Sequence, residues 1–253
     1  MAGMRRSLSF LLVLAAIGAA PLSSQAQSAA GGEGVSDLAF AAQPFVHSAP
    51  APIPAGIARY GPFRVIDGRS AALVAATDEY TPAQFAAMMR DYPLIARLEL
   101  VECPGTYEDR ANLRLGRMIR AAGLVTHVPR GGSVRSGAVE LFLAGAERLV
   151  DEGAEFAVHS WVDEDGLQAN DYAENAPESR KYLVYYQEMG MDAVTARKFY
   201  AMTNAVPFGS ARWFGSAEMR HWLGQGAPAA PSRPSIFGGN AVLAYLDLEA
   251  GLN

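Results

Sequence analysis

Short apolar runs alternate with amphipathic segments from about residue 60 onward. Two runs, at residues 63–66 and 71–76, flank an Asp-Gly pair and predict two strands joined by a tight turn. A helix is expected next, with Thr81 as its N-cap and Pro82 at its first helical position. Strands are then expected at residues 96–102, 124–128, 149–150 and 156–159, and helices at residues 107–122 and 139–144. Because strands and helices alternate, we predict one α/β domain with crossover connections and largely parallel strands.

The pattern then changes toward both ends of this domain. Residues 170–205 have a helical pattern with charges on one face, and residues 213–223 follow, with Ser216 as the expected N-cap. We therefore place the folded domain at residues 61–224. An Ala/Pro/Gly-rich flexible lead-in at residues 27–60 is expected before it, and a Pro-rich tail with a short apolar helix at residues 225–253 after it. His47 lies in the lead-in and is interpreted as incidental.

The first 26 residues have the features of a secretory signal. Arg5 and Arg6 precede an apolar run at residues 7–21, and Ser24-Gln25-Ala26 is a small-x-small cleavage site. The apolar run is shorter than the stretch that a spanning helix needs. We therefore predict a Sec-type signal peptide at residues 1–26, a periplasmic or secreted protein, and no membrane span after cleavage. An uncleaved N-terminal anchor is the alternative.

Charge and cysteine content exclude several classes of function. The chain has 21 basic and 26 acidic residues, a net charge of −5, and cleavage after Ala26 removes two arginines and no acid, which leaves −7. Nucleic-acid binding needs a basic patch, so no nucleic-acid partner is expected. Cys103 is the only cysteine, so no intrachain disulfide can form. The sequence has no Cys/His cluster and no phosphate-loop or dinucleotide motif, so we expect neither a metal nor a cofactor.

Ser136 and His159 are the candidate catalytic pair. Ser136 opens a small-residue, helix-like stretch, and His159 ends a predicted strand 23 residues later. A seryl hydroxyl needs a base to take its proton as it attacks, and a neutral imidazole within hydrogen-bond reach supplies that base. A serine at a loop-to-helix junction also places the next main-chain N–H where it can bind an oxyanion. The alternatives are a small residue packed at a tight junction and a buried structural histidine.

Five short segments, in this order, resemble the Clp protease proteolytic subunit and crotonase superfamily, and within it a group of exported bacterial proteins. They are CPGT at 103–106, GRMIRAAGLVTHV at 116–128, VRSGA at 134–138, FLAGAERLV at 142–150 and FAVHSW at 156–161. The resemblance implies a fold of repeated ββα units with stacked, largely parallel strands and crossover helices. It also implies assembly into rings, so a homo-oligomer is expected, with the apolar tail segment at residues 243–248 as one contact.

The resemblance also implies a role for each residue of the site. Ser136 corresponds to the nucleophile of the family and His159 to its general base. The main-chain N–H groups of Gly105 and Gly137 correspond to the oxyanion hole. The sequence departs from the family at the turn after Gly105, where Thr106 replaces a second glycine. This replacement narrows the conformational freedom of the turn.

The third member of the catalytic group is missing from its expected position. Ala211 stands where the family peptidases carry the aspartate that orients the histidine. Without an acceptor on the far ring nitrogen, the tautomer of the imidazole is less fixed. Ser210 and Asn204 are the candidate replacements, in that order. The acids at residues 163–165, a main-chain carbonyl and water are the alternatives.

The leading hypothesis is an exported, peptidase-like serine hydrolase that cleaves a peptide or other acyl bond by a Ser–His mechanism with a degenerate third residue. Its partner is then a peptide or a small acyl substrate. The competing hypothesis is a catalytically inactive envelope binding or interaction protein that keeps the fold, and Thr106 and Ala211 motivate it. Acyl-CoA chemistry, as in crotonases, is disfavoured because acyl-CoA is a cytosolic substrate and the chain carries a predicted export signal.

Overall fold

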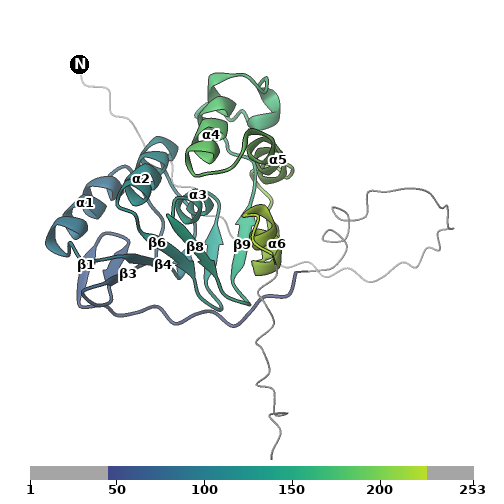
Figure 1. Cartoon of the computed structure of the whole chain (residues 1–253). Coiled ribbons are helices and arrows are strands. Elements are labelled where there is room, and N and C mark those ends of the chain that lie inside the picture. Colours follow the sequence, from purple (N-terminus) through teal and green to yellow (C-terminus); the bar gives the residue numbers. More distant parts are fainter. Residues whose placement is uncertain (1–44, 227–253) are drawn as a thin grey trace, which may run out of the picture. The chain divides into compact units, whose positions relative to one another are not determined.

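The computed structural model describes residues 45–226 (Figure 1). The predicted signal peptide, residues 27–44 of the lead-in and the tail beyond residue 226, with its expected helix, lie outside the described residues. Among the helices of residues 45–226, none combines the length and the apolar character that a membrane span requires.

Six strands form the first sheet, in the order β1-β2-β3-β4-β6-β8. They are β1 Ala58–Tyr60, β2 Phe63–Val65, β3 Ser70–Leu73, β4 Arg97–Leu100, β6 Val125–Val128 and β8 Glu147–Val150. β2 pairs antiparallel with β1 and with β3, and the predicted Asp-Gly turn joins β2 to β3. β3, β4, β6 and β8 pair in parallel. The protein is therefore an α/β protein with largely parallel strands, as the alternating pattern predicted.

Four strands form a second sheet, in the order β10-β9-β7-β5. They are β5 Glu102–Cys103, β7 Ser133–Arg135, β9 Glu155–Val158 and β10 Arg212–Gly215. β5, β7 and β9 pair in parallel, and β10 is antiparallel to β9. Only Val101 separates β4 from β5, so the single strand expected at residues 96–102 is in fact two strands in two sheets. β10 likewise occupies the start of the predicted segment at residues 213–223.

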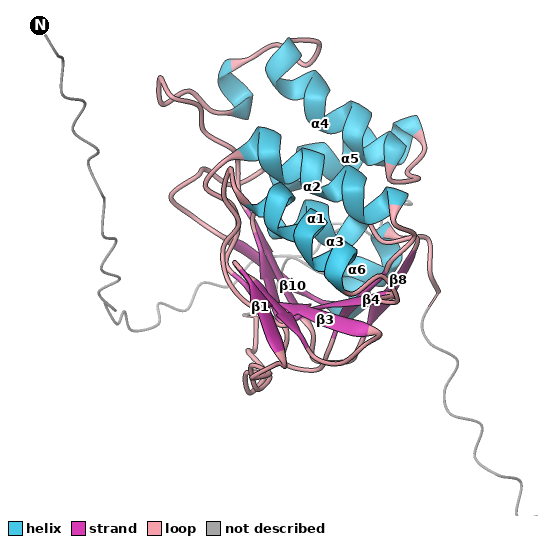
Figure 2. Cartoon of the chain, turned by 90° about the vertical axis from the view of Figure 1, so that its left-hand side faces the viewer, coloured by secondary structure: helices cyan, strands magenta, loops and turns pink. Residues whose placement is uncertain are grey.

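Helices lie on one side of these strands (Figure 2). They are α1 Thr81–Asp91, α2 Asp109–Ala121, α3 Ala138–Leu143, α4 Pro177–Glu188, α5 Ala193–Thr203 and α6 Ser216–Trp222. The orders β4-β5-α2 and β6-β7-α3 repeat one unit, with a strand in the first sheet, a strand in the second sheet and then a helix. α4 and α5 account for the helical pattern at residues 170–205, after a short 3-10 helix at Ala169–Asp171.

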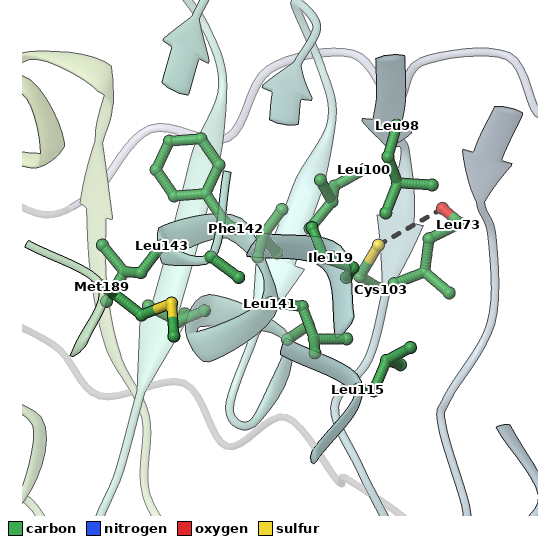
Figure 3. Packing of buried hydrophobic residues seen from close by; sticks show 14 of the residues in the cluster. Leu73, Leu98, Leu100, Cys103, Leu115, Ile119, Leu141, Phe142, Leu143 and Met189 are labelled. Atoms are coloured by element: carbon green, nitrogen blue, oxygen red, sulfur yellow. Dashed lines mark hydrogen bonds between the residues drawn. The ribbon is translucent and has the colours of Figure 1, made fainter. Parts of the chain in front are cut away.

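An apolar core joins the helices to the strands (Figure 3). Leu98 of β4, Ile119 of α2 and Phe142 of α3 are fully buried in the same cluster. Cys103 is buried there too, and its Sγ donates to the carbonyl of Leu73 at 3.3 Å. Burial raises the pKa of the Cys103 thiol far above its ordinary value, so this cysteine is not a reactive thiolate.

Residues 45–57 cross the other side of the strands and are attached there (Figure 1). His47 Nδ1 lies 2.9 Å from a carboxylate oxygen of the buried Glu155, and the main-chain N–H of Ser48 donates to the same carboxylate. The His47 ring also packs edge-on against Trp213, with centroids 4.6 Å apart. The expectation of a flexible lead-in is therefore wrong for this segment, because a buried carboxylate and an aromatic ring hold it.

Two predicted N-caps are wrong. Thr81 is the first residue of α1 and Ser216 the first residue of α6, and the N-cap positions are Tyr80 and Gly215. Asp78 takes over the capping of α1. Its Oδ1 accepts from the N–H of Tyr80 at 3.0 Å, the N–H of Thr81 at 3.0 Å and the hydroxyl of Thr81 at 2.8 Å. A carboxylate at this position satisfies the free N–H groups of the first helical turn.

Replacing Asp78 with alanine should therefore destabilise the protein. The N–H of Tyr80 loses its acceptor, and the N–H of Thr81 keeps only its bond to the main-chain carbonyl of residue 78 at 3.2 Å, which together costs about 1 kcal/mol of unfolding free energy. The exposed neighbour Glu79 makes no hydrogen bond within residues 45–226, so Glu79→Ala is the matched control. Urea unfolding curves of both variants measure the difference. Equal stabilities of the two variants would contradict the capping role.

Candidate active site

Three parts of the predicted site follow three neighbouring parallel strands of the second sheet. Gly105 comes shortly after β5, Ser136 directly after β7 and His159 directly after β9, and β7 lies between the other two strands. The carboxyl ends of parallel strands meet at one edge of a sheet, which is where ligands bind in many α/β proteins. Ser136, Gly137 and His159 accordingly line one cavity of about 750 Å³. This volume is within the range of small-molecule and peptide-binding pockets.

Ser136 occupies a strained turn between a strand and a helix. Its φ angle is +49°, and it is the only residue other than glycine with a positive φ in residues 45–226. Its N–H donates to the carbonyl of Ala157 in β9 at 2.8 Å, which holds the turn against the neighbouring strand. An L-residue in this conformation costs about 1–2 kcal/mol, and such strain is often found where a side chain has to be presented to a substrate.

Two glycines bring main chain close to the Ser136 side chain. A Cβ atom on Gly105, whose φ is +128°, would lie 3.0 Å from the Cβ of Ser136 and 3.5 Å from its Oγ. A Cβ on Gly137 would lie 2.6 Å from the Thr106 methyl group, so Thr106 leaves no room for a larger residue at position 137. The N–H groups of Gly105 and Gly137 make no hydrogen bond to the part of the chain that the structure describes. Gly137 lines the cavity, so its N–H is free to donate to a ligand there, whereas Gly105 is buried and is not part of the cavity wall.

A buried polar network holds these two glycine segments together. The N–H of Thr77 donates to the carbonyl of Gly105 at 3.0 Å, and its hydroxyl donates to Asn112 Oδ1 at 2.9 Å. Asn112 Nδ2 in turn donates to the carbonyl of Gly137 at 2.6 Å. Thr77 is 1% and Asn112 2% exposed, so water does not compete with these bonds. The sequence analysis did not find this network, because the three segments that form it are far apart in the chain.

Among the residues that the structure describes, the His159 imidazole has a hydrogen-bond partner on one nitrogen only. Nδ1 lies 2.9 Å from the carbonyl oxygen of Ser160, and the ring packs edge-on against Phe208 with centroids 5.0 Å apart. A carbonyl can only accept, so Nδ1 carries the proton in the neutral ring and Nε2 keeps its lone pair. No hydrogen bond joins His159 to Ser136 among the described residues; in unliganded sites such bonds are frequently long and tighten when substrate binds.

The candidates for the missing third residue make no hydrogen bond to this imidazole within residues 45–226. Ser210 is exposed and is not part of the cavity wall. Asn204 lines the cavity, but its amide bonds to Tyr200, Thr203 and the N–H of Trp161. The acceptor role therefore belongs to the main-chain carbonyl of Ser160, which was one of the alternatives.

The acids at residues 163–165 have a different role. Asp163 accepts from the main-chain N–H groups of Asp165 at 3.0 Å and Leu167 at 2.8 Å, and from the hydroxyl of Tyr172. The bond from Tyr172 holds the pKa of Asp163 below its ordinary value, and the same bond raises the pKa of Tyr172 to about 12. Asp163 is therefore ionised and shapes the loop at the edge of the cavity, where Asp163, Glu164 and Asp165 are part of the lining.

Glu140 is a further cavity residue that the sequence analysis did not single out. It lies on α3, four residues after Ser136, and is only 7% exposed. Tyr186 donates to its Oε1 at 2.8 Å. Burial raises the pKa of the Glu140 carboxyl to about 7, although the bond from Tyr186 favours the ionised form. The sequence pattern did not identify Glu140, because only the packing of α3 in the folded protein shows that this acid is buried.

Comparisons with known proteins do not assign this site. No family model matches the chain, and no curated protein matches its sequence.

Removing the Ser136 side chain in two ways should reveal the strain in its turn. Glycine adopts φ +49° without the penalty that alanine keeps, so Ser136→Gly should be more stable than Ser136→Ala by about 1 kcal/mol. Ser133 lies in the regular strand β7, where glycine is expected to be the less stable of the two replacements. Denaturant unfolding of all four variants tests this. The same order of stabilities at both positions would contradict the strained turn.

Glu140→Gln should change how stability depends on pH. The folded protein keeps the Glu140 proton up to about pH 7, whereas the unfolded chain releases it near pH 4.5. The free energy of unfolding of the wild type should therefore fall by about 2 kcal/mol between pH 5 and pH 8 because of this group. The glutamine variant has no proton to release at this position and should lack this contribution. Urea unfolding at both pH values measures this difference, with Glu164→Gln as a control at an exposed acid of the same cavity. An unchanged pH profile in Glu140→Gln would contradict the raised pKa.

Proposed function

We propose that the protein is a serine hydrolase that cleaves a peptide or another acyl bond. The observation that carries the proposal is the strained turn at Ser136, which lies against Gly105 and lines the same cavity as His159. A strand, a serine with positive φ and a helix form the arrangement by which other hydrolases expose a nucleophile at the edge of a sheet. A serine that only packs a junction gains nothing from this strain, because a glycine would fit the same turn without it.

The available groups can carry out acyl transfer in two steps. Ser136 Oγ attacks the carbonyl carbon while His159 Nε2 takes its proton, and the N–H groups of Gly105 and Gly137 donate to the oxygen that becomes negative. His159 then gives the proton to the leaving group, which departs as an amine or alcohol and leaves an acyl-serine. Water attacks this ester with His159 again as base, which releases the acid and restores Ser136.

The family resemblance supports the same proposal. The repeated order of first-sheet strand, second-sheet strand and helix agrees with the ββα units of the Clp protease and crotonase superfamily. The turns that carry Gly105, Ser136 and His159 follow neighbouring strands of the second sheet, which supports a shared role for the three residues. We therefore also propose that the protein is a member of this superfamily. On this proposal, its signal peptide exports it to the periplasm or medium, and it assembles into a homo-oligomer.

A second candidate function is an inactive binding protein of the same fold. Two observations favour it. The His159 ring has a main-chain carbonyl on Nδ1 in place of the aspartate of the family, and no hydrogen bond connects Ser136 and His159 within residues 45–226. A carbonyl fixes the tautomer of the ring but stabilises its positive charge less than a carboxylate does. Slow catalysis or none would therefore distinguish the binding protein from the hydrolase.

Labelling with a fluorophosphonate, which reacts with activated serines, decides between the two. We expect the full-length wild type to be labelled at Ser136, Ser136→Ala not to be labelled, and His159→Gln to react at least about 100-fold more slowly because it lacks the base. Ser133→Ala is the matched control, since Ser133 lies three residues earlier and outside the cavity wall, and it should react like the wild type. Absence of labelling in the folded wild type, or equal labelling of Ser136→Ala, would support the binding protein.

A further inference from the structure

Two main-chain peptide groups meet at Gly137, and a different hydrogen bond holds each of them. The carbonyl of Ser136 accepts from the N–H of Val139 at 2.9 Å, and the carbonyl of Gly137 accepts from Asn112 Nδ2 at 2.6 Å. The N–H and the carbonyl of one trans peptide point in opposite directions, so a bond to the Ser136 carbonyl also fixes the plane of the Gly137 N–H. The direction of this N–H is therefore stable only while both peptide groups are held.

The bond from Asn112 matters because residue 137 is a glycine. A Cβ at this position would lie 2.6 Å from the Thr106 methyl group and 3.1 Å from Asn112 Nδ2, so only glycine fits without a shift of its neighbours. Glycine has the widest range of φ and ψ angles of all residues, and by itself it does not keep its N–H in one direction. Asn112 therefore excludes a side chain at this position and also supplies the constraint that a glycine lacks.

Asn112 is itself held in one orientation. It lies in the first half of α2, where the Glu108 side chain caps the helix, and it is 2% exposed. The hydroxyl of Thr77 donates to its Oδ1 at 2.9 Å. The Gly137 carbonyl can only accept, so the amino group of the amide faces Gly137 and its oxygen faces Thr77. Thr77 is not part of the cavity wall, and it therefore reaches the site only through other protein groups.

We propose that Asn112 is a positioning residue of the hydrolase, which directs the Gly137 N–H at the oxygen that becomes negative, and that Thr77 orients Asn112 for this role. The inference rests on the proposed function and adds two residues to it, neither of which takes part in proton transfer. A donor stabilises a developing oxyanion only when it is already in place, and a misplacement of about 1 Å can cost about 100-fold in rate. The bond from Asn112 therefore acts on the rate of the chemical step and not on the binding of substrate.

Labelling of full-length Asn112→Asp with a fluorophosphonate tests the proposal. Aspartate keeps the shape of the side chain and the acceptor for Thr77, but in its ionised form it has no donor for the Gly137 carbonyl. At pH 8 we expect a limiting rate, kinact, at least about tenfold below the wild type, with the apparent KI of the probe within about twofold. At pH 6 the buried aspartic acid regains a proton and a donor, so the ratio of wild-type to variant kinact should fall. Titration of His159 affects both proteins alike and cancels in this ratio.

A second variant and a matched control separate positioning from stability. Thr77→Val removes only the hydroxyl and keeps the main-chain bond to Gly105, and it should lower kinact by about threefold or more because Asn112 loses its donor. Thr126→Val is the control. Thr126 is fully buried outside the cavity wall, and its hydroxyl donates to the Phe142 carbonyl of α3 at 2.7 Å. Its loss should lower the unfolding temperature and leave kinact within about twofold of the wild type.

The outcomes separate the positioning role from the proposed function. A reactive wild type whose Asn112→Asp variant has an unchanged kinact, or a deficit that is the same at both pH values, overturns the positioning role and leaves the hydrolase. A deficit that Thr126→Val shares overturns it as well, because any lost buried bond would then have the same effect. Thermal unfolding verifies that each variant is folded, and Thr77→Val decides by itself if Asn112→Asp does not fold. A folded wild type that never reacts removes the hydrolase and the positioning role together.

Discussion

The main chain reverses direction sharply at Ser136 as it passes from β7 into α3, and the geometry of the cavity depends on how that reversal is held. A seryl residue at φ +49° is unfavourable by itself, so the surrounding structure has to compensate for it. The bond from the Ser136 N–H to Ala157 attaches the turn to β9 on one side. The bonds from Thr77 through Asn112 to the Gly137 carbonyl attach it on the other side. Because these partners are buried, the turn cannot relax without leaving polar groups unsatisfied.

The division of the strands between two sheets brings the parts of the site together. After β4, β6 and β8 the chain passes at once, or after a short loop, into a strand of the second sheet, and β5, β7 and β9 are neighbours there. Gly105, Ser136 and His159 then follow the same ends of adjacent strands. A continuous strand from residue 97 to residue 103 would carry Gly105 along the first sheet and away from the serine. The change of sheet at Val101 is therefore a condition for the site and not a detail of the topology.

Electrostatics in the cavity differ between its edge and its depth. Asp163 is solvated, accepts several hydrogen bonds and has a lowered pKa, whereas Glu140 is buried, accepts one side-chain bond and has a raised pKa. The same functional group therefore has opposite behaviour at two positions of one cavity. Hydrogen bonds to the ionised form outweigh burial at the first position, and burial outweighs them at the second.

Local pattern was sufficient for much of the fold. The strands around the Asp-Gly turn, the helix that Gly123 ends and the helix after Ser136 all follow from the spacing of apolar residues and turn residues, and each is present. Ser136 and His159 were found as a pair for the same reason, since Ser136 opens a predictable helix and His159 ends a predictable strand, although the strand β7 before Ser136 was not predicted. The tertiary structure alone decided which strand belongs to which sheet, that Asp78 rather than Thr81 caps α1, and that His47 is attached to Glu155. It also decided that a carbonyl, not Ser210 or Asn204, binds the imidazole, and that Thr77, Asn112 and Glu140 belong to the site. These are contacts and burial between segments distant in the chain, which short-range periodicity does not encode.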